Sequence, residues 1–221
     1  MTAAPGRSGR PDDPDSPESP ERTDRLGELM RTRRAIRRFT ARPVPDDLVR
    51  EILEAGRWAP SPANLQPTRF IHVRDTRTKQ RLQDLAHESK ELSGYWDPIF
   101  RPGGSSATVN DLLRPTVIAV CADPAKSLTN VHADNGFEWA AAMSIYAMWL
   151  RAHSLGLGGV FVQHWITEKA KAILNVPLGW TFLGTFTCGY AAQTKVTDER
   201  ERLPFDELVF TDRFPGAPRP R

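Results

Sequence analysis

The chain has 221 residues, of which 39% are hydrophobic and 26% are charged, so it can bury a sizeable apolar core and is neither collagen-like nor wholly disordered. Its formal net charge of +3 is too small to indicate a nucleic-acid or membrane partner. The two cysteines, Cys121 and Cys188, lie far apart in the sequence, which excludes a CxxC redox pair and indicates reduced, buried thiols.

Residues 1–24 are rich in Pro, Asp, Ser and Arg and poor in apolar residues. Such a segment buries too little apolar surface to offset the entropy of ordering it, so we expect a disordered tail there. It also lacks the apolar stretch of a signal peptide, and no part of the chain has the roughly 20 apolar residues of a membrane-spanning helix. We therefore expect a cytoplasmic protein that does not contact a membrane.

Downstream of the tail, apolar periodicity predicts alternating helices and strands. The first helix runs from Leu26 into a basic cluster at residues 33–38, and the second runs from Pro45 to near Trp58. Further helices are expected over residues 76–90, 134–155 and 168–175, the last with Thr167 as N-cap, and strands over 70–73, 116–121, 160–162 and 180–190. The helix at 134–155 is apolar nearly all round, which predicts burial. The order indicates one α/β or α+β domain over residues 25–213, with a flexible end at 214–221.

Three arginines stand close together at the predicted end of the first helix, namely Arg33, Arg34 and Arg37. Several guanidinium groups at one place provide the donors that a phosphate group needs. A second pair, Arg200 and Arg202, points to one side of an extended chain, which suits the binding of one anion. In both cases the alternative is an ordinary solvated basic surface, which at the end of a helix also complements the helix dipole.

The segment at residues 59–67, APSPANLQP, contains three prolines, which exclude a helix and stiffen the backbone. Asn64 and Gln66 each offer donor and acceptor groups on this stiff loop, so they are candidates to bind the polar edge of a heterocycle. The alternative is that the prolines only shape a turn and that Asn64 bonds to the backbone.

A glycine run, LGLGG, follows the long apolar helix at residues 155–159. It matches neither the GxGxxG motif nor a phosphate loop, so we infer only that its backbone can approach something flat. The chain has no recognisable Ser/His/Asp set and no HExxH motif, and its five histidines are dispersed, so a metal site is not expected.

Taken in order, five motifs resemble those of the nitroreductase family of FMN-dependent oxidoreductases. They are RRAIRRF at residues 33–39, APSPANLQP at 59–67, LGLGG at 155–159, GY at 189–190 and RERLP at 200–204. The resemblance extends over residues 26–210. It implies an α+β nitroreductase-like fold, in which a mostly antiparallel sheet is flanked by helices and two chains form an intertwined homodimer by exchanging C-terminal arms.

The resemblance also implies the residues that bind FMN, at two sites on the dimer interface. The phosphate and ribityl chain would be held by Arg33, Arg34, Ala35 and Arg37, and enclosed from the other side by Arg200 and Arg202. The partner subunit would contribute Pro60, Ser61, Pro62 and Asn64. The isoalloxazine would lie beside Gln163 and His164, where backbone N–H groups stabilise the electron density that arrives at flavin N5.

The implied reaction uses NADH or NADPH. A reduced nicotinamide passes hydride to flavin N5 and leaves, and a small-molecule acceptor such as a nitroaromatic or a quinone then takes its place, which gives ping-pong kinetics. No catalytic side chain is required, although His164 is a candidate proton donor, with a role that only shapes the site as the alternative. Tyr95, Trp96 and Phe100 are candidates for a lid over the acceptor or for packing against the subunit surface.

Three positions depart from the usual family pattern. Ala35 stands where many members have Ser, Thr68 replaces an aromatic residue, and His164 replaces a small residue. These departures affect the expected phosphate contacts and acceptor range more than the identity of the cofactor. Two alternatives stay open: a flavoenzyme with other chemistry, such as natural-product dehydrogenation or oxygen-dependent flavin modification, and a basic nucleic-acid-binding module that uses residues 33–38.

Overall fold

The computed structural model describes residues 20–93, 111–127, 135–192 and 202–214, with only the backbone described in 20–23 and 90–93. Its centre is a sheet of four strands: β1 (Thr68–Val73), β2 (Thr116–Ala122), β3 (Gly158–Val162) and β4 (Thr181–Gly189). The order across the sheet is β1-β2-β4-β3, and every neighbouring pair is antiparallel. The predicted α+β class and antiparallel sheet are therefore confirmed.

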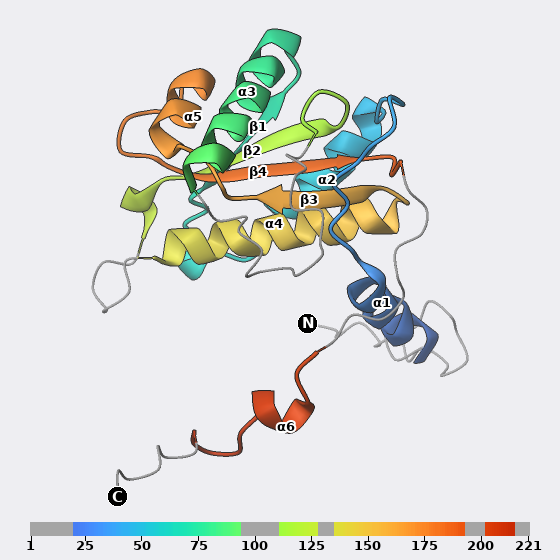
Figure 1. Ribbon diagram of the computed structural model, residues 1–221. Coiled ribbons are helices and arrows are strands. Elements are labelled where there is room, and N and C mark those ends of the chain that lie inside the picture. The colour runs from blue at the N-terminus through green and yellow to red at the C-terminus, as the bar shows by residue number, and fades with distance from the viewer. Residues whose placement is uncertain (1–19, 94–110, 128–134, 193–201, 215–221) are drawn as a thin grey trace, which may run out of the picture.

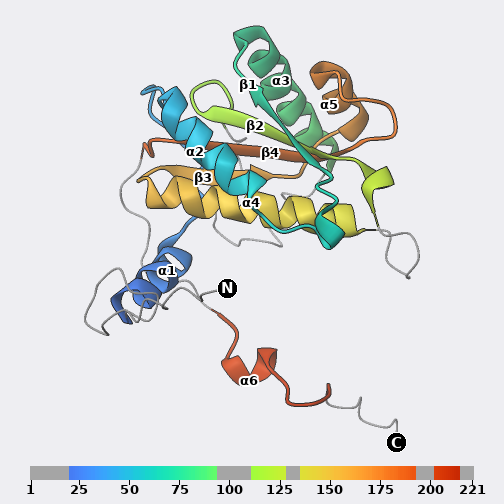
Figure 2. The same cartoon turned by 180° about the vertical axis from the view of Figure 1, so that it is seen from behind.

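Helices cover both faces of the sheet (Figure 1). One face packs against α2 (Asp46–Arg57) and α4 (Gly136–Ser154), and the other packs against α3 (Thr76–Ser93) and α5 (Thr167–Leu174), as Figure 2 shows from behind. All seven residues of β2 are buried, because this central strand is covered from both sides. The two cores meet at the sheet, with Met148 and Phe186 on one side and Leu82 and Phe182 on the other.

Local sequence signals account for most of these helices. α2 begins directly after Pro45, and Asp46 and Asp47 in its first turn lie near the positive end of the helix dipole. α5 differs from the prediction at its start, since its N-cap is Ile166 and no side chain caps it. Thr167 already belongs to the first turn, so the predicted capping role is wrong.

The first helix, α1 (Pro20–Thr32), begins inside the segment 1–24 that the composition predicts to be disordered, and it ends before Arg33. The helix does not continue through the basic cluster because the next residues pair with the sheet instead: the backbone N–H of Ile36 donates to Gly159 O at 2.9 Å. Residues 1–19 and 215–221 lie outside the described residues, so the predicted tail and flexible end stay predictions.

α4 is the longest helix among the described residues, and only one of its faces is buried. Ala141 and Met148 are completely covered, whereas Trp139, Met143 and Tyr146 are 54%, 38% and 43% exposed. The prediction that an all-round apolar helix is buried all round is therefore wrong for the single chain. Its second apolar face is open to solvent.

A bulge interrupts β4 opposite β2. The register shifts between Val120 and Cys121, where β4 holds one residue more than its neighbour. Gly184 at this point has a φ of +139°, and a Cβ atom added to it would lie 2.2 Å from the carbonyl oxygen of Val162 in β3. Only glycine fits between the two strands here.

Candidate functional site

The arginine cluster lies along the edge of the sheet. β3 is an edge strand, and the segment that follows α1 runs beside its first residues, where Ala35 forms a parallel bridge to Gly159. The glycine run makes this approach possible: a Cβ atom added to Gly158 would lie 2.7 Å from Cβ of Ile36. The close approach expected for these glycines is therefore to the arginine segment of the same chain.

The guanidinium groups of this segment already make contacts with other groups of the protein. Arg34 Nη1 donates to the carbonyl oxygens of Arg31 and Arg33, at 2.6 and 3.0 Å, so it complements the C-terminal end of α1. Arg37 Nη1 donates to Ala35 O at 3.5 Å. The Arg33 guanidinium stacks on the indole of Trp149 in α4, with its Cζ atom 4.2 Å from the ring centroid. Arg34 thus complements the end of α1 through its Nη1 atom, while Arg33 turns toward α4.

The pKa of His153 in α4 responds to the positive charge of this region. Thr32 Oγ1 donates to Glu28 O at 2.7 Å and therefore accepts from His153 Nε2, which lies 2.8 Å away. The pKa of His153 is lowered, first by burial and then by the charges of Arg33 and Arg34. The imidazole is consequently held neutral as a donor at the junction of α1 and α4.

This arrangement predicts a pH dependence of stability. The pKa of His153 and that of His72 in β1 are both lowered from 6.5, mainly by burial, so the unfolded chain binds more protons than the folded chain as the pH falls through about 6.5. Stability is therefore full above this value and falls as the pH drops below it. We expect urea unfolding midpoints to fall between about pH 7.5 and 5.5, and to fall less in the double variant His72→Gln/His153→Gln. An equal fall in that variant would contradict the assignment.

A groove lies on the open side of α4, against the ends of β3 and β4. Its volume is about 520 Å³, and α4 provides most of its apolar wall. It is lined by Glu138, Trp139, Ala142, Ile145, Tyr146, Trp149, Phe161, Gln163, Thr181, Phe182 and Leu183. Gln163, which follows β3, is exposed in this groove, and the neighbouring His164 is half-buried. Trp149 lines the groove, and the Arg33 guanidinium stacks on its ring, so the arginine segment adjoins the groove.

The proline-rich loop has a defined backbone that local hydrogen bonds hold in place. It contains the short 3-10 helix η1 (Pro62–Asn64), and Ala63, Asn64 and Gln66 have positive φ values of 45°, 54° and 49°. Three bonds tie the loop together: Gln66 N donates to Ser61 Oγ at 3.0 Å, Gln66 Nε2 donates to Asn64 Oδ1 at 3.1 Å, and Arg69 Nη1 donates to Gln66 O at 2.9 Å. Its backbone is therefore held rigid before any ligand binds.

The loop and the arginines lie at opposite ends of α4 (Figures 1 and 2). A Cβ atom added to Gly136, the first residue of α4, would lie 3.4 Å from Pro62 Cγ, whereas Arg33 stacks on Trp149 near the other end. A helix of 19 residues is about 28 Å long. One chain thus brings residues 33–37 to the start of β3, the strand that Gln163 follows, but it does not bring Pro60, Ser61, Pro62 or Asn64 to them.

Arg202 of the second arginine pair begins a C-terminal arm. Arg202 is exposed at the start of residues 202–214, which include α6 (Phe205–Leu208) and lie away from the sheet in both views (Figures 1 and 2). The arm exposes Phe205 and Phe214 at 74% and 76%. Arg200 and the candidate lid residues Tyr95, Trp96 and Phe100 lie outside the described residues.

The groove residues of α4 were missed by the sequence analysis. Trp139, Tyr146 and Trp149 fall at helical spacings on one face, a signal that was available in the sequence. The apolar pattern around α4 hides this signal, because the same pattern predicts a helix that is buried on every side.

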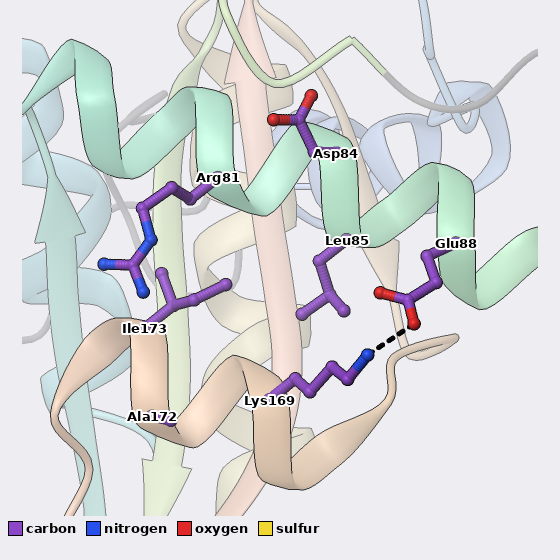
Figure 3. A pocket seen from close by; sticks show the side chains of 7 residues that line it. All are labelled: Arg81, Asp84, Leu85, Glu88, Lys169, Ala172 and Ile173. Carbon is purple, nitrogen blue, oxygen red and sulfur yellow. Dashed lines mark hydrogen bonds and ion pairs between the residues drawn. The ribbon is translucent and has the colours of Figure 1, made fainter.

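A second cavity lies on the opposite face of the sheet, between α3 and α5 (Figure 3). It measures about 380 Å³ and has Leu85, Ala172 and Ile173 in its wall. An ion pair between Lys169 and Glu88 connects the two helices across it, as the dashed line shows. None of the predicted site residues lines this cavity.

Within the described ranges, no cluster of three or more His, Cys, Asp or Glu side chains could hold a metal ion. The helices of the same ranges include none with the length and apolar character needed to cross a membrane.

Known proteins with similar sequences and folds were found for most of the chain. The sequence model of the Nitroreductase family matches residues 30–190. A protein of Thermus thermophilus named NADH dehydrogenase is 31% identical over 192 residues, which cover 80% of this chain and 91% of that protein. The 5,6-dimethylbenzimidazole synthase of Rhodospirillum rubrum is 27% identical over 80% of this chain and 87% of its own length.

Among solved structures, a nitroreductase of Desulfovibrio desulfuricans in complex with FMN has 29% sequence identity and a TM-score of 0.63. The match covers 86% of this chain and 98% of that one.

Proposed function

Because this chain belongs to the nitroreductase family, we propose that it is an FMN-dependent oxidoreductase that takes electrons from NADH or NADPH and reduces a small-molecule acceptor, such as a nitroaromatic or a quinone. The relative from Desulfovibrio desulfuricans, which binds FMN, supports the choice of cofactor. The cytoplasmic location expected from the sequence is part of this proposal.

One observation carries the proposal: an arginine-rich segment and a groove with several aromatic side chains in its wall adjoin through Trp149. FMN has an anionic phosphate at one end and a flat ring system at the other, and the two parts of the site match these two ends. The charges of Arg33 and Arg34 add to the effect of burial in lowering the pKa of His153, and this positive charge favours an anion at that end. The residues present therefore fit the cofactor.

The chain's own residues bind and orient the cofactor in this proposal. Arg33, Arg34, Ala35 and Arg37 hold the phosphate and ribityl chain, with Arg200 and Arg202 enclosing it. Gln163 and His164 stand beside the ring and donate backbone N–H groups to it. Bound FMN supplies a ring that accepts and gives up hydride, which allows donor and acceptor to use one site in turn.

The proposed site needs two copies of the chain. The loop residues Pro60, Ser61, Pro62 and Asn64 lie at the far end of α4 from Arg33, which favours their contribution to the cofactor beside Arg33 from a partner subunit. The exposed apolar face of α4 and the exposed phenylalanines of the C-terminal arm support a homodimer in which arms are exchanged, because such surfaces are normally covered.

Absorption spectroscopy of the purified protein tests the proposal. We expect a yellow protein that carries, or takes up, one FMN per chain, and that oxidises NADH or NADPH when a quinone or nitroaromatic is added. Titration of the FMN-free protein with FMN is a second measurement, and it needs no electron acceptor. A colourless protein that binds no added FMN would contradict the proposal.

The similarity to the relative named 5,6-dimethylbenzimidazole synthase favours a second candidate, the oxygen-dependent flavin-modifying enzyme that the sequence analysis left open. Incubation of the reduced holoprotein with oxygen distinguishes the two. Loss of intact flavin with a new aromatic product supports this second candidate, whereas recovery of all the flavin supports the acceptor reductase.

A further inference from the structure

Trp149 lies between the two parts of the proposed site. The Arg33 guanidinium stacks on its ring, with the Arg33 Cζ atom 4.2 Å from the ring centroid. The same ring lines the groove that contains Gln163. The indole packs against Phe186 of β4, with 6.1 Å between the ring centroids, and joins the core of the α4 side. This packing limits how far the ring, and the arginine stacked on it, can turn.

In a single chain, a Trp at this position lowers the stability of the fold. Its Nε1 atom is buried and has no hydrogen-bond partner among the described residues. An unsatisfied buried donor lowers stability, and Phe or Leu would avoid it. What Trp provides over both is the strongest attraction of any aromatic ring for a guanidinium group.

We propose that Trp149 is a positioning residue for phosphate recognition, which holds the Arg33 guanidinium at the rim of the groove where the FMN phosphate binds. This inference rests on the proposed function. A free arginine side chain loses much conformational freedom when it binds an anion, so stacking it in advance reduces that loss. The backbone of the segment is fixed as well, by the bond from Ile36 N to Gly159 O.

Affinities for FMN and riboflavin separate this role from a merely structural one, because riboflavin lacks the phosphate. In Trp149→Leu we expect the Kd for FMN to rise about tenfold and the Kd for riboflavin to change less than about twofold. Trp149→Phe, which keeps an aromatic face, is expected to retain FMN affinity within about threefold of the wild type. Quenching of flavin fluorescence on titration with protein measures all of these values. Trp58→Leu is the matched control, because Trp58 is an exposed tryptophan on which the Arg57 guanidinium stacks.

A double-mutant cycle completes the test. If Trp149 acts through Arg33, Trp149→Leu has no further effect on FMN affinity in an Arg33→Leu background. Equal weakening of FMN and riboflavin, unchanged FMN affinity in Trp149→Leu, or a full additional loss in the double variant would each overturn the proposal. Wild-type protein that binds neither flavin would instead overturn the proposed function, so the two failures are distinguishable.

Discussion

Replacing Gly184 by alanine is expected to lower the free energy of unfolding by about 3–5 kcal/mol. Two effects combine at this position: φ is +139°, which L-residues with a Cβ rarely adopt, and the new Cβ would lie 2.2 Å from Val162 O. The obstructing atom is backbone, so no side chain can turn away to make room. β3 and β4 must separate, and this weakens the sheet edge that carries both the arginine segment and Gln163.

Gly179→Ala is the matched control, because Gly179 also has a positive φ, of +85°, but no atom lies within 4 Å of the added Cβ. We expect a loss of only about 1 kcal/mol there, from backbone strain alone. Urea denaturation of the two variants measures both values. Equal losses in the two would show that the close approach of the strands at Gly184 has no energetic consequence.

The elements set by local signals could be predicted from the sequence. α2 lies within one residue of its predicted start, because a proline followed by two acids marks the beginning of a helix wherever it occurs. The buried β2 was equally clear from its uninterrupted apolar run. The bulge at Gly184 was not predicted, although a glycine inside a strand is a signal for one, because the extra residue depends on the register with β2.

The candidate site depends on contacts between distant segments, and these could be predicted only in part. The resemblance placed Arg33 and Gln163 together, and the structure brings their segments to one edge of the sheet through Gly159 and Trp149. Residue spacing alone carried no information about this meeting. Trp149 was missed because the same apolar pattern that predicts a buried helix also describes a helix with one face on a sheet and one face in a binding groove.

Introducing a charge on the exposed face of α4 is expected to separate the proposed homodimer and to remove the cofactor with it. Met143 is 38% exposed between Trp139 and Tyr146 and does not itself line the groove. In Met143→Glu a symmetric interface would bury two unpaired carboxylates, each at a cost of several kcal/mol, so the dimer Kd should rise by about 1,000-fold or more. Light scattering coupled to size-exclusion chromatography measures the mass, and absorbance measures bound FMN.

Leu178→Glu is the control for this change, because Leu178 is 97% exposed in the connection between α5 and β4 and does not belong to α4. It introduces the same charge on an equally apolar side chain and should leave both mass and FMN content unchanged. If the loop at Pro60–Asn64 contacts FMN from the partner subunit, the mass and the FMN content fall together. Monomers then lose affinity for FMN even though Arg33 and Trp149 are intact. A monomeric Met143→Glu protein that binds FMN as tightly as the wild type would place the whole binding site in one chain.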